Sequence, residues 1–123
     1  MHEMGLAQGV LEIALEAAGG EKVRRIDLLV GKGQMVKQDS LEFSFRLIAD
    51  GTPAADAHFR MKEIPIRLRC KRCGLEQETD APPFNCRGCG SADLQVLSGD
   101  EFLVDAVELE SGRTIVRQPT AVR

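Results

Sequence analysis

Four cysteines stand in two pairs of identical spacing. Cys70 and Cys73 form one C-x-x-C unit, and Cys86 and Cys89 form a second one after twelve intervening residues. Two disulfides are one interpretation, but the sequence shows no secretory signal, and thiols stay reduced in the cytosol. Paired C-x-x-C units at about this separation are typical of zinc sites, because Zn²⁺ binds four thiolates tetrahedrally. The spacing therefore predicts a Zn(Cys)₄ site.

The expected zinc site is structural. Four thiolates fill the coordination sphere, whereas a catalytic zinc keeps a position open for water. A glycine follows each pair, at Gly74 and Gly90, where the backbone must turn back beneath the metal. We expect the binding free energy of the metal to become folding free energy of this segment.

A second set of ligands lies at the amino end, in the tripeptide Met1-His2-Glu3. The terminal amine of Met1 and the amide and imidazole nitrogens of His2 can close two fused chelate rings on one metal ion. The amide of Glu3 or an outside side chain can complete a square-planar set. Planar nitrogen-rich sites suit Ni²⁺ and Cu²⁺. The alternative is that His2 is a solvated residue at a frayed terminus.

Other chemistry finds little support in the sequence. The chain has no G-x-S-x-G elbow, no phosphate-binding glycine loop and no H-E-x-x-H motif, so we expect no enzyme activity. Gly31-Lys32-Gly33 is interpreted as a turn. His58, on the polar side of an expected strand, is interpreted as a surface residue. Small redox proteins also use C-x-x-C, but thiols held by zinc would not exchange disulfides.

Basic residues gather near the cysteines, at Arg67, Arg69, Lys71, Arg72 and Arg87. A Zn(Cys)₄ centre carries a charge of −2, and nearby cations offset it. A nucleic-acid groove would carry more positive charge and more aromatic rings than the single Phe84 of this region. The whole chain has a net charge of −3, no Trp and no Tyr. Nucleic acid is therefore not an expected partner.

A chain of 123 residues is long enough for one domain with a small insert. The spacing of its apolar residues predicts the helices and strands that position the candidate ligands. Leu6 to Ala17 reads as an amphipathic helix that ends at Gly19-Gly20. A second helix is expected to begin at Asp39, with Glu42 completing a capping box. Alternating apolar residues predict strands near 22–31, 57–65 and 101–110. No stretch is long and apolar enough to cross a membrane.

The expected fold class is α/β (α+β), with two helices packed on a three-stranded sheet and an inserted zinc ribbon. In this scheme residues 1–65 form the first part of the α/β domain and 66–99 form the zinc-ribbon domain. Residues 100–112 return as the last strand of the α/β domain, and 113–123 form a flexible tail.

In combination, Met1-His2-Glu3 opening a helix, the β-α-β body and the inserted Cys70-x-x-Cys73…Cys86-x-x-Cys89 resemble the HypA/HybF family of hydrogenase nickel-incorporation proteins. The resemblance covers about residues 1–110. It implies a cytoplasmic nickel metallochaperone that delivers Ni(II) during [NiFe]-hydrogenase maturation, and in some organisms to urease. It implies a HypB-type GTPase and the hydrogenase large subunit as partners, and a monomer or weak dimer.

The resemblance also assigns roles to residues. His2 would be the key nickel ligand, with Met1 and Glu3 supplying backbone nitrogens, and Asp39 would be an accessory carboxylate. The four cysteines would hold structural zinc. The main alternative is a zinc-ribbon interaction or regulatory module that carries no transferable metal.

Overall fold

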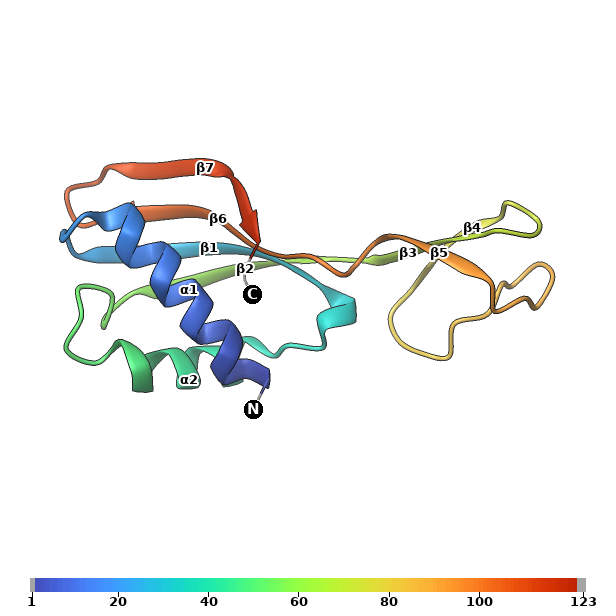
Figure 1. Cartoon of the computed structure of the whole chain (residues 1–123), viewed down its shortest axis with the longest axis horizontal. Helices are drawn as coiled ribbons and strands as arrows, with labels where there is room; N and C mark the ends of the chain where they lie inside the picture. The colour runs from blue at the N-terminus through green and yellow to red at the C-terminus, as the bar shows by residue number, and fades with distance from the viewer. Residues whose placement is uncertain (1, 122–123) are drawn as a thin grey trace. The chain divides into compact units, whose positions relative to one another are not determined.

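The computed structural model describes residues 2–121, with side chains described for residues 3–115. The chain divides into two compact units (Figure 1). The first, here called the α/β unit, contains the residues up to Leu29, Val36–Lys62 and the chain from Phe102 onward. The second, here called the four-cysteine unit, contains Val30–Met35 and Glu63–Glu101.

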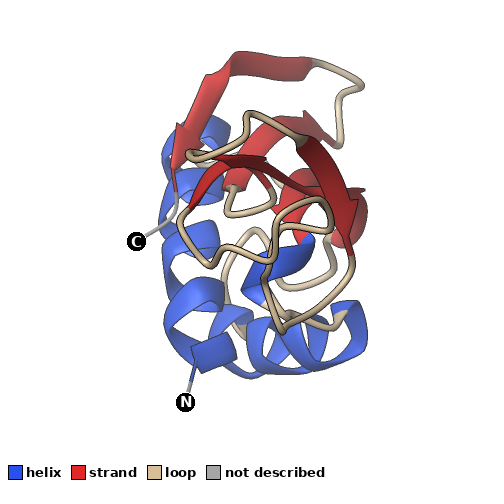
Figure 2. Ribbon diagram, turned by 90° about the vertical axis from the view of Figure 1, so that its right-hand side faces the viewer, coloured by secondary structure: helices blue, strands red, loops and turns tan. Residues whose placement is uncertain are grey.

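Two helices form one layer of the α/β unit. Helix α1 spans His2–Ala18 and helix α2 spans Gln38–Ala49, and they pack against each other (Figure 2). Each buries residues at helical spacing, with Val10 and Ala14 fully buried on α1 and Leu41 and Phe45 on α2. Within residues 2–121, neither helix has the length and hydropathy that a bilayer crossing requires.

The α/β unit also contains a four-stranded sheet with the order β2-β1-β6-β7, and α1 contacts its strand β6. Its strands are β1 (Val23–Gly31), β2 (His58–Ile64), β6 (Phe102–Leu109) and β7 (Thr114–Ala121). Ile26 and Leu28 on β1 and Val104 on β6 are buried, in the alternating pattern of a sheet with one face against a core. The α+β class with two helices is confirmed, but the sheet has four strands instead of the expected three.

The fourth strand, β7, lies where the sequence predicts a flexible tail. It pairs antiparallel with β6 through a turn at Ser111-Gly112. Gly112 has a φ of 92°, which glycine adopts without steric cost. Thr114 and Ile115 then continue in a β-branched, strand-favouring sequence. Basic residues and a proline farther along interrupt the apolar alternation, so hydrophobic periodicity alone does not predict this strand.

The start of α2 also differs from the prediction. The helix begins at Gln38, and its N-cap Lys37 makes no side-chain capping bond. The capping box expected from Asp39 and Glu42 is therefore absent; instead, the Gln38 amide donates to the Glu42 carboxylate (3.1 Å). Asp39 lies in the first turn, where the helix dipole favours a negative charge.

The four-cysteine unit is built on a three-stranded antiparallel sheet with the order β4-β3-β5. The strands are β3 (Ile66–Cys70), β4 (Glu76–Thr79) and β5 (Leu94–Ser98), and a short 3₁₀ helix, η1, spans Lys32–Gln34. Strand β4 is not apparent in the sequence because Glu-Gln-Glu-Thr carries no apolar alternation. Between Ile66 and Gly99 the buried apolar side chains are only Ile66, Leu68, Cys70 and Cys86.

Three glycines allow backbone segments to touch in the four-cysteine unit. The N–H of Gly31 donates to Glu101 (2.7 Å), and that of Gly33 donates to Gly99 (2.7 Å). A β-carbon at Gly31 would overlap the Gly99 carbonyl, and one at Gly99 would lie 2.6 Å from the Ile66 α-carbon. The Gly31-Lys32-Gly33 motif thus serves close chain packing as well as turning.

Replacing Gly31 with alanine is therefore expected to lower the free energy of unfolding by about 1–3 kcal/mol, the usual range for overpacking. Urea unfolding measures the change. The matched control is Gly5→Ala on α1, where a β-carbon meets no atom within 4 Å. That substitution should raise stability by up to about 1 kcal/mol because alanine favours the helix. A Gly31→Ala protein as stable as the unmodified chain would contradict the packing argument.

Candidate functional site

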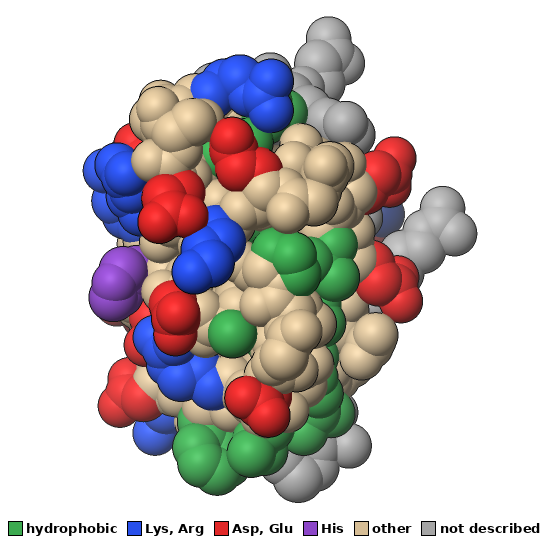
Figure 3. All heavy atoms as spheres, turned by 90° about the vertical axis from the view of Figure 1, so that its left-hand side faces the viewer, with side chains coloured by type: hydrophobic (Ala, Val, Ile, Leu, Met, Phe, Trp, Pro, Cys, Tyr) green, Lys and Arg blue, Asp and Glu red, His purple; other side chains and the backbone are tan. Residues whose placement is uncertain are grey.

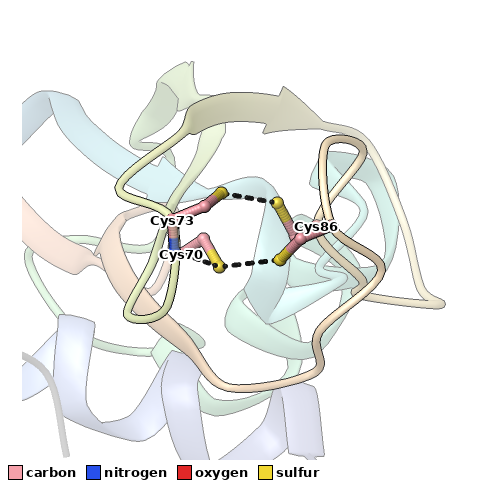
Figure 4. Close-up of side chains that lie close together, drawn as sticks. Cys70, Cys73 and Cys86 are labelled. Atoms are coloured by element: carbon pink, nitrogen blue, oxygen red, sulfur yellow. Dashed lines mark hydrogen bonds between the residues drawn. The ribbon is translucent and has the colours of Figure 1, made fainter.

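The four cysteine sulfurs converge on one point. Their Sγ atoms all lie within 4.8 Å of one another, with Cys70 to Cys89 at 3.6 Å and Cys73 to Cys86 at 3.5 Å (Figure 4). A tetrahedron of sulfurs bonded to zinc at 2.3 Å has edges of about 3.8 Å. The sulfurs are therefore already spaced for a tetrahedral metal, and the free thiols form no disulfide. The predicted four-cysteine cluster is confirmed, and its donor set fits zinc.

Backbone N–H groups donate hydrogen bonds to two of the sulfurs. Cys70 Sγ accepts hydrogen bonds from the N–H groups of Arg72 and Cys73, both at 3.4 Å, and Cys86 Sγ accepts one from Gly88 at 3.3 Å. Each pair ends in a tight turn in which Gly74 or Gly90 donates back to the first cysteine of the pair. Both glycines have a positive φ, 81° and 76°, as their position in the sequence suggests.

These contacts shift the pKa values of the thiols in different directions. The N–H groups of Cys73 and Arg72, together with the neighbouring sulfurs, lower the pKa of Cys70 to about 6 despite burial. The N–H groups of Cys89 and Gly88 likewise lower the pKa of Cys86. For Cys73, the Leu75 N–H acts to lower the pKa, but the Cys86 sulfur and desolvation outweigh it, and the pKa rises to about 11. A pKa of about 6 favours the thiolate form of Cys70, the form that binds metals, at neutral pH.

Ion pairs involve three of the five basic residues near the cysteines. Arg67 pairs with Glu76 (3.3 Å) and Glu78 (3.4 Å), and Arg69 pairs with Glu76 (2.9 Å). These pairs connect the neighbouring strands β3 and β4 on the exposed face of the unit. Lys71 lies 3.8 Å from Asp93. The charges of these three residues are therefore offset by neighbouring carboxylates.

The second predicted site, at the amino end, is described only in part. Met1 lies outside the described residues, and for His2 the structure describes the backbone, as the first residue of α1, but not the side chain. Glu3 is described, and it lines a surface hollow together with Asp39, Ser40, Phe43 and Ser44. The structure thus brings the expected accessory carboxylate to the same hollow as the third residue of the chain.

His58 is exposed on β2 and lines a different hollow with Asp56 and Glu110. Among residues whose side chains are described, the cysteines are the only cluster of three or more His, Cys, Asp or Glu that could hold a metal.

Sequence reasoning missed Phe43, which lines the amino-end hollow. Its signal is an aromatic residue on the side of α2 opposite the buried stripe.

Comparison with known proteins agrees with these observations. Residues 1–109 match the family described as "Hydrogenase/urease nickel incorporation, metallochaperone, hypA". The chain is 37% identical over 110 residues to the hydrogenase maturation factor HypA of Nostoc sp., covering 89% of this chain and 96% of that one. It is 39% identical over 113 residues to the protein of that name from Desulfatibacillum aliphaticivorans, covering 89% and 87%.

The fold is also similar to a solved structure. The solution structure of the Ni metallochaperone HypA from Helicobacter pylori matches with a TM-score of 0.63 at 19% identity, covering 89% of this chain and 97% of that one. At this identity the match concerns the fold alone. Together with the family match over most of the sequence, these findings show that the chain belongs to the HypA family of nickel-incorporation metallochaperones.

Proposed function

We propose that this chain carries Ni(II) at its amino terminus and releases it to a nickel enzyme under assembly. In this proposal the amine of Met1 and the amide and imidazole nitrogens of His2 bind the ion. The amide of Glu3 completes a planar set. Asp39 is an accessory group that binds the exchanging ion or hydrogen-bonds its ligands.

The observation that carries the proposal is the position of His2 and Glu3 in the first turn of α1, beside a hollow that contains both Glu3 and Asp39. The first N–H groups of a helix have no intrahelical acceptor. Nickel can therefore replace the amide protons of His2 and Glu3 without breaking a hydrogen bond of the helix. A helix also holds His2 and Glu3 on the folded unit more firmly than a free tail would.

The four-cysteine cluster takes a different part in this proposal. When bound there, zinc would cross-link the two C-x-x-C turns. Its four protein ligands leave no position for substrate, so its role would be structural. Nickel and zinc are then kept apart by donor type, nitrogen at one site and sulfur at the other. Copper outranks nickel at any nitrogen site, so selectivity for nickel must come from partner docking and metal supply.

The proteins proposed to receive nickel are inferred from the family to which the chain belongs. We propose the large subunit of a [NiFe]-hydrogenase as the destination, with a HypB-type GTPase as a partner and urease as a second destination. The reduced cysteines suit the cytoplasm, where thiols are kept reduced. The chain itself acts by ligand exchange and needs no catalytic group.

Blocking the terminal amine tests this proposal. Protein that begins at Met1 should bind one nickel ion in a planar, diamagnetic site with its own absorption band. Adding Gly-Ser before Met1 turns the amine into an amide, removes one chelate ring and should weaken nickel binding by at least about 100-fold, more than the 10–100-fold typical of outer-sphere changes. Competition with a chromophoric chelator measures both affinities, and zinc content serves as the control. Equal nickel affinity in the two proteins would exclude the terminal site and favour an interaction module without transferable metal.

A further inference from the structure

Helix α2 presents two large apolar side chains to solvent. Phe43 is 67% exposed and Leu47 is 58% exposed, and they are one helical turn apart. The opposite side of the helix is buried, where Phe45 packs edge-on against Phe59 with ring centroids 4.8 Å apart. The fold is thus stabilised by the inner side of α2, and the two outer residues add nothing to that core. Hydrophobic side chains gather at the level of α2 on the face shown in Figure 3.

The two exposed residues continue the line of Asp39. Positions 39, 43 and 47 follow one another at intervals of four, so their side chains leave the same side of the helix. Asp39 and Phe43 both line the amino-end hollow, and Leu47 lies one turn beyond it. The surface formed by Phe43 and Leu47, here called the α2 stripe, is therefore continuous with the proposed nickel site.

We propose that the α2 stripe is the docking surface for the protein that receives nickel. This inference rests on the proposed function, because ligand exchange requires the acceptor's ligands to come within reach of the carried ion. A protein seated on Leu47 and Phe43 also reaches the hollow, since Phe43 belongs to both. The contact area of two side chains is small, which suits a complex that must separate after each delivery.

Charge defines the chemistry of this partner. The hollow at one end of the stripe is lined by Glu3 and Asp39. The half-buried Glu42 lies on the same helix, and Lys37 is its N-cap residue. Among the described side chains, neither Asp39 nor Glu42 forms an ion pair. At the other end, Arg46 is held by the carbonyl of Ala55 (3.3 Å). The complementary surface is an apolar patch with basic side chains at the edge that faces the hollow.

The test uses Leu47→Gln, which changes the stripe outside the hollow and keeps a good helix former. The probe is the metal-free large-subunit precursor of the [NiFe]-hydrogenase from the same cell. We expect Leu47→Gln to weaken binding of that precursor, and to slow nickel transfer to it, by about tenfold. Nickel affinity and transfer to EDTA should stay unchanged. Leu47→Met, which keeps the apolar surface, should behave like the unmodified chain.

The outcomes separate this inference from the function on which it rests. Unchanged precursor binding and transfer in Leu47→Gln would overturn the docking surface, even if nickel binds at the amino end. Equal slowing of transfer to EDTA would overturn it too, because the effect would then lie in the metal site. If sedimentation shows that Leu47→Gln only dissociates a dimer, the occupant is a second copy of this chain and the inference fails. If the unmodified chain binds no nickel while Leu47→Gln still weakens precursor binding, the docking surface stands and the nickel proposal fails.

Discussion

Substituting Cys70 with serine is expected to abolish stoichiometric zinc binding and to unfold the segment between β3 and β5. Cys70 is 2% exposed, and its sulfur accepts two backbone N–H bonds. The segment buries few apolar side chains, so it lacks a core that could fold it without metal. Structural zinc in small peptides contributes about 10–16 kcal/mol at pH 7, so we expect metal binding to stabilise this segment more than its few buried side chains do.

Metal analysis and limited proteolysis measure this result. The zinc-to-protein ratio should fall well below one, and cleavage should concentrate between Ile66 and Gly99. The α/β unit, with its own buried residues, should stay resistant. Arg72→Ala is the matched control, because it lies between two ligands but donates to Cys70 through its backbone N–H, which alanine keeps. A Cys70→Ser protein with full zinc and an intact segment would show that the cysteines do not fold it.

Substituting His2 with alanine is expected to reduce nickel affinity by at least about 100-fold while zinc content and the fold persist. The imidazole closes one of the two proposed chelate rings, and removing a direct ligand costs more than the 10–100-fold of an outer-sphere change. Calorimetry or chelator competition on protein with a native amino terminus measures the affinity. Circular dichroism and zinc analysis show whether the fold survives.

The chain offers one matched control for this prediction. His58 is the only other histidine, and it is exposed on β2. His58→Ala should bind nickel as the unmodified chain does, because the hollow that it lines contains neither Glu3 nor Asp39. Equal loss of nickel in both variants would mean that binding reflects histidines in general and not the amino-terminal chelate.

Local patterns in the sequence were sufficient to predict much of this fold. The alternation of Ile26 and Leu28 predicts β1, and the spacing of Val10 and Ala14 predicts α1, because burial imposes these periods. The cysteine spacing predicts the sulfur cluster, since two C-x-x-C turns can supply a tetrahedral set by local geometry.

Features that depend on tertiary contacts could not be predicted in the same way. Strand β4 has no apolar alternation, and β7 is defined by pairing with β6 more than by its own residues. Asp39 reads as a cap in the sequence, but the helix begins one residue earlier and the side chain lines a hollow with Glu3, 36 positions away. The close packing of Gly31 on Gly99 also joins distant segments, so the sequence suggests only a turn.

X-ray absorption at the nickel edge, on protein that carries both metals and a native amino terminus, tests the account most directly. The account predicts nickel with nitrogen and oxygen ligands only, an imidazole contribution that disappears in His2→Ala, and no sulfur. At the zinc edge it predicts four sulfurs, with or without nickel. Sulfur bound to nickel would place the transported ion among the cysteines and contradict the separation of the two sites.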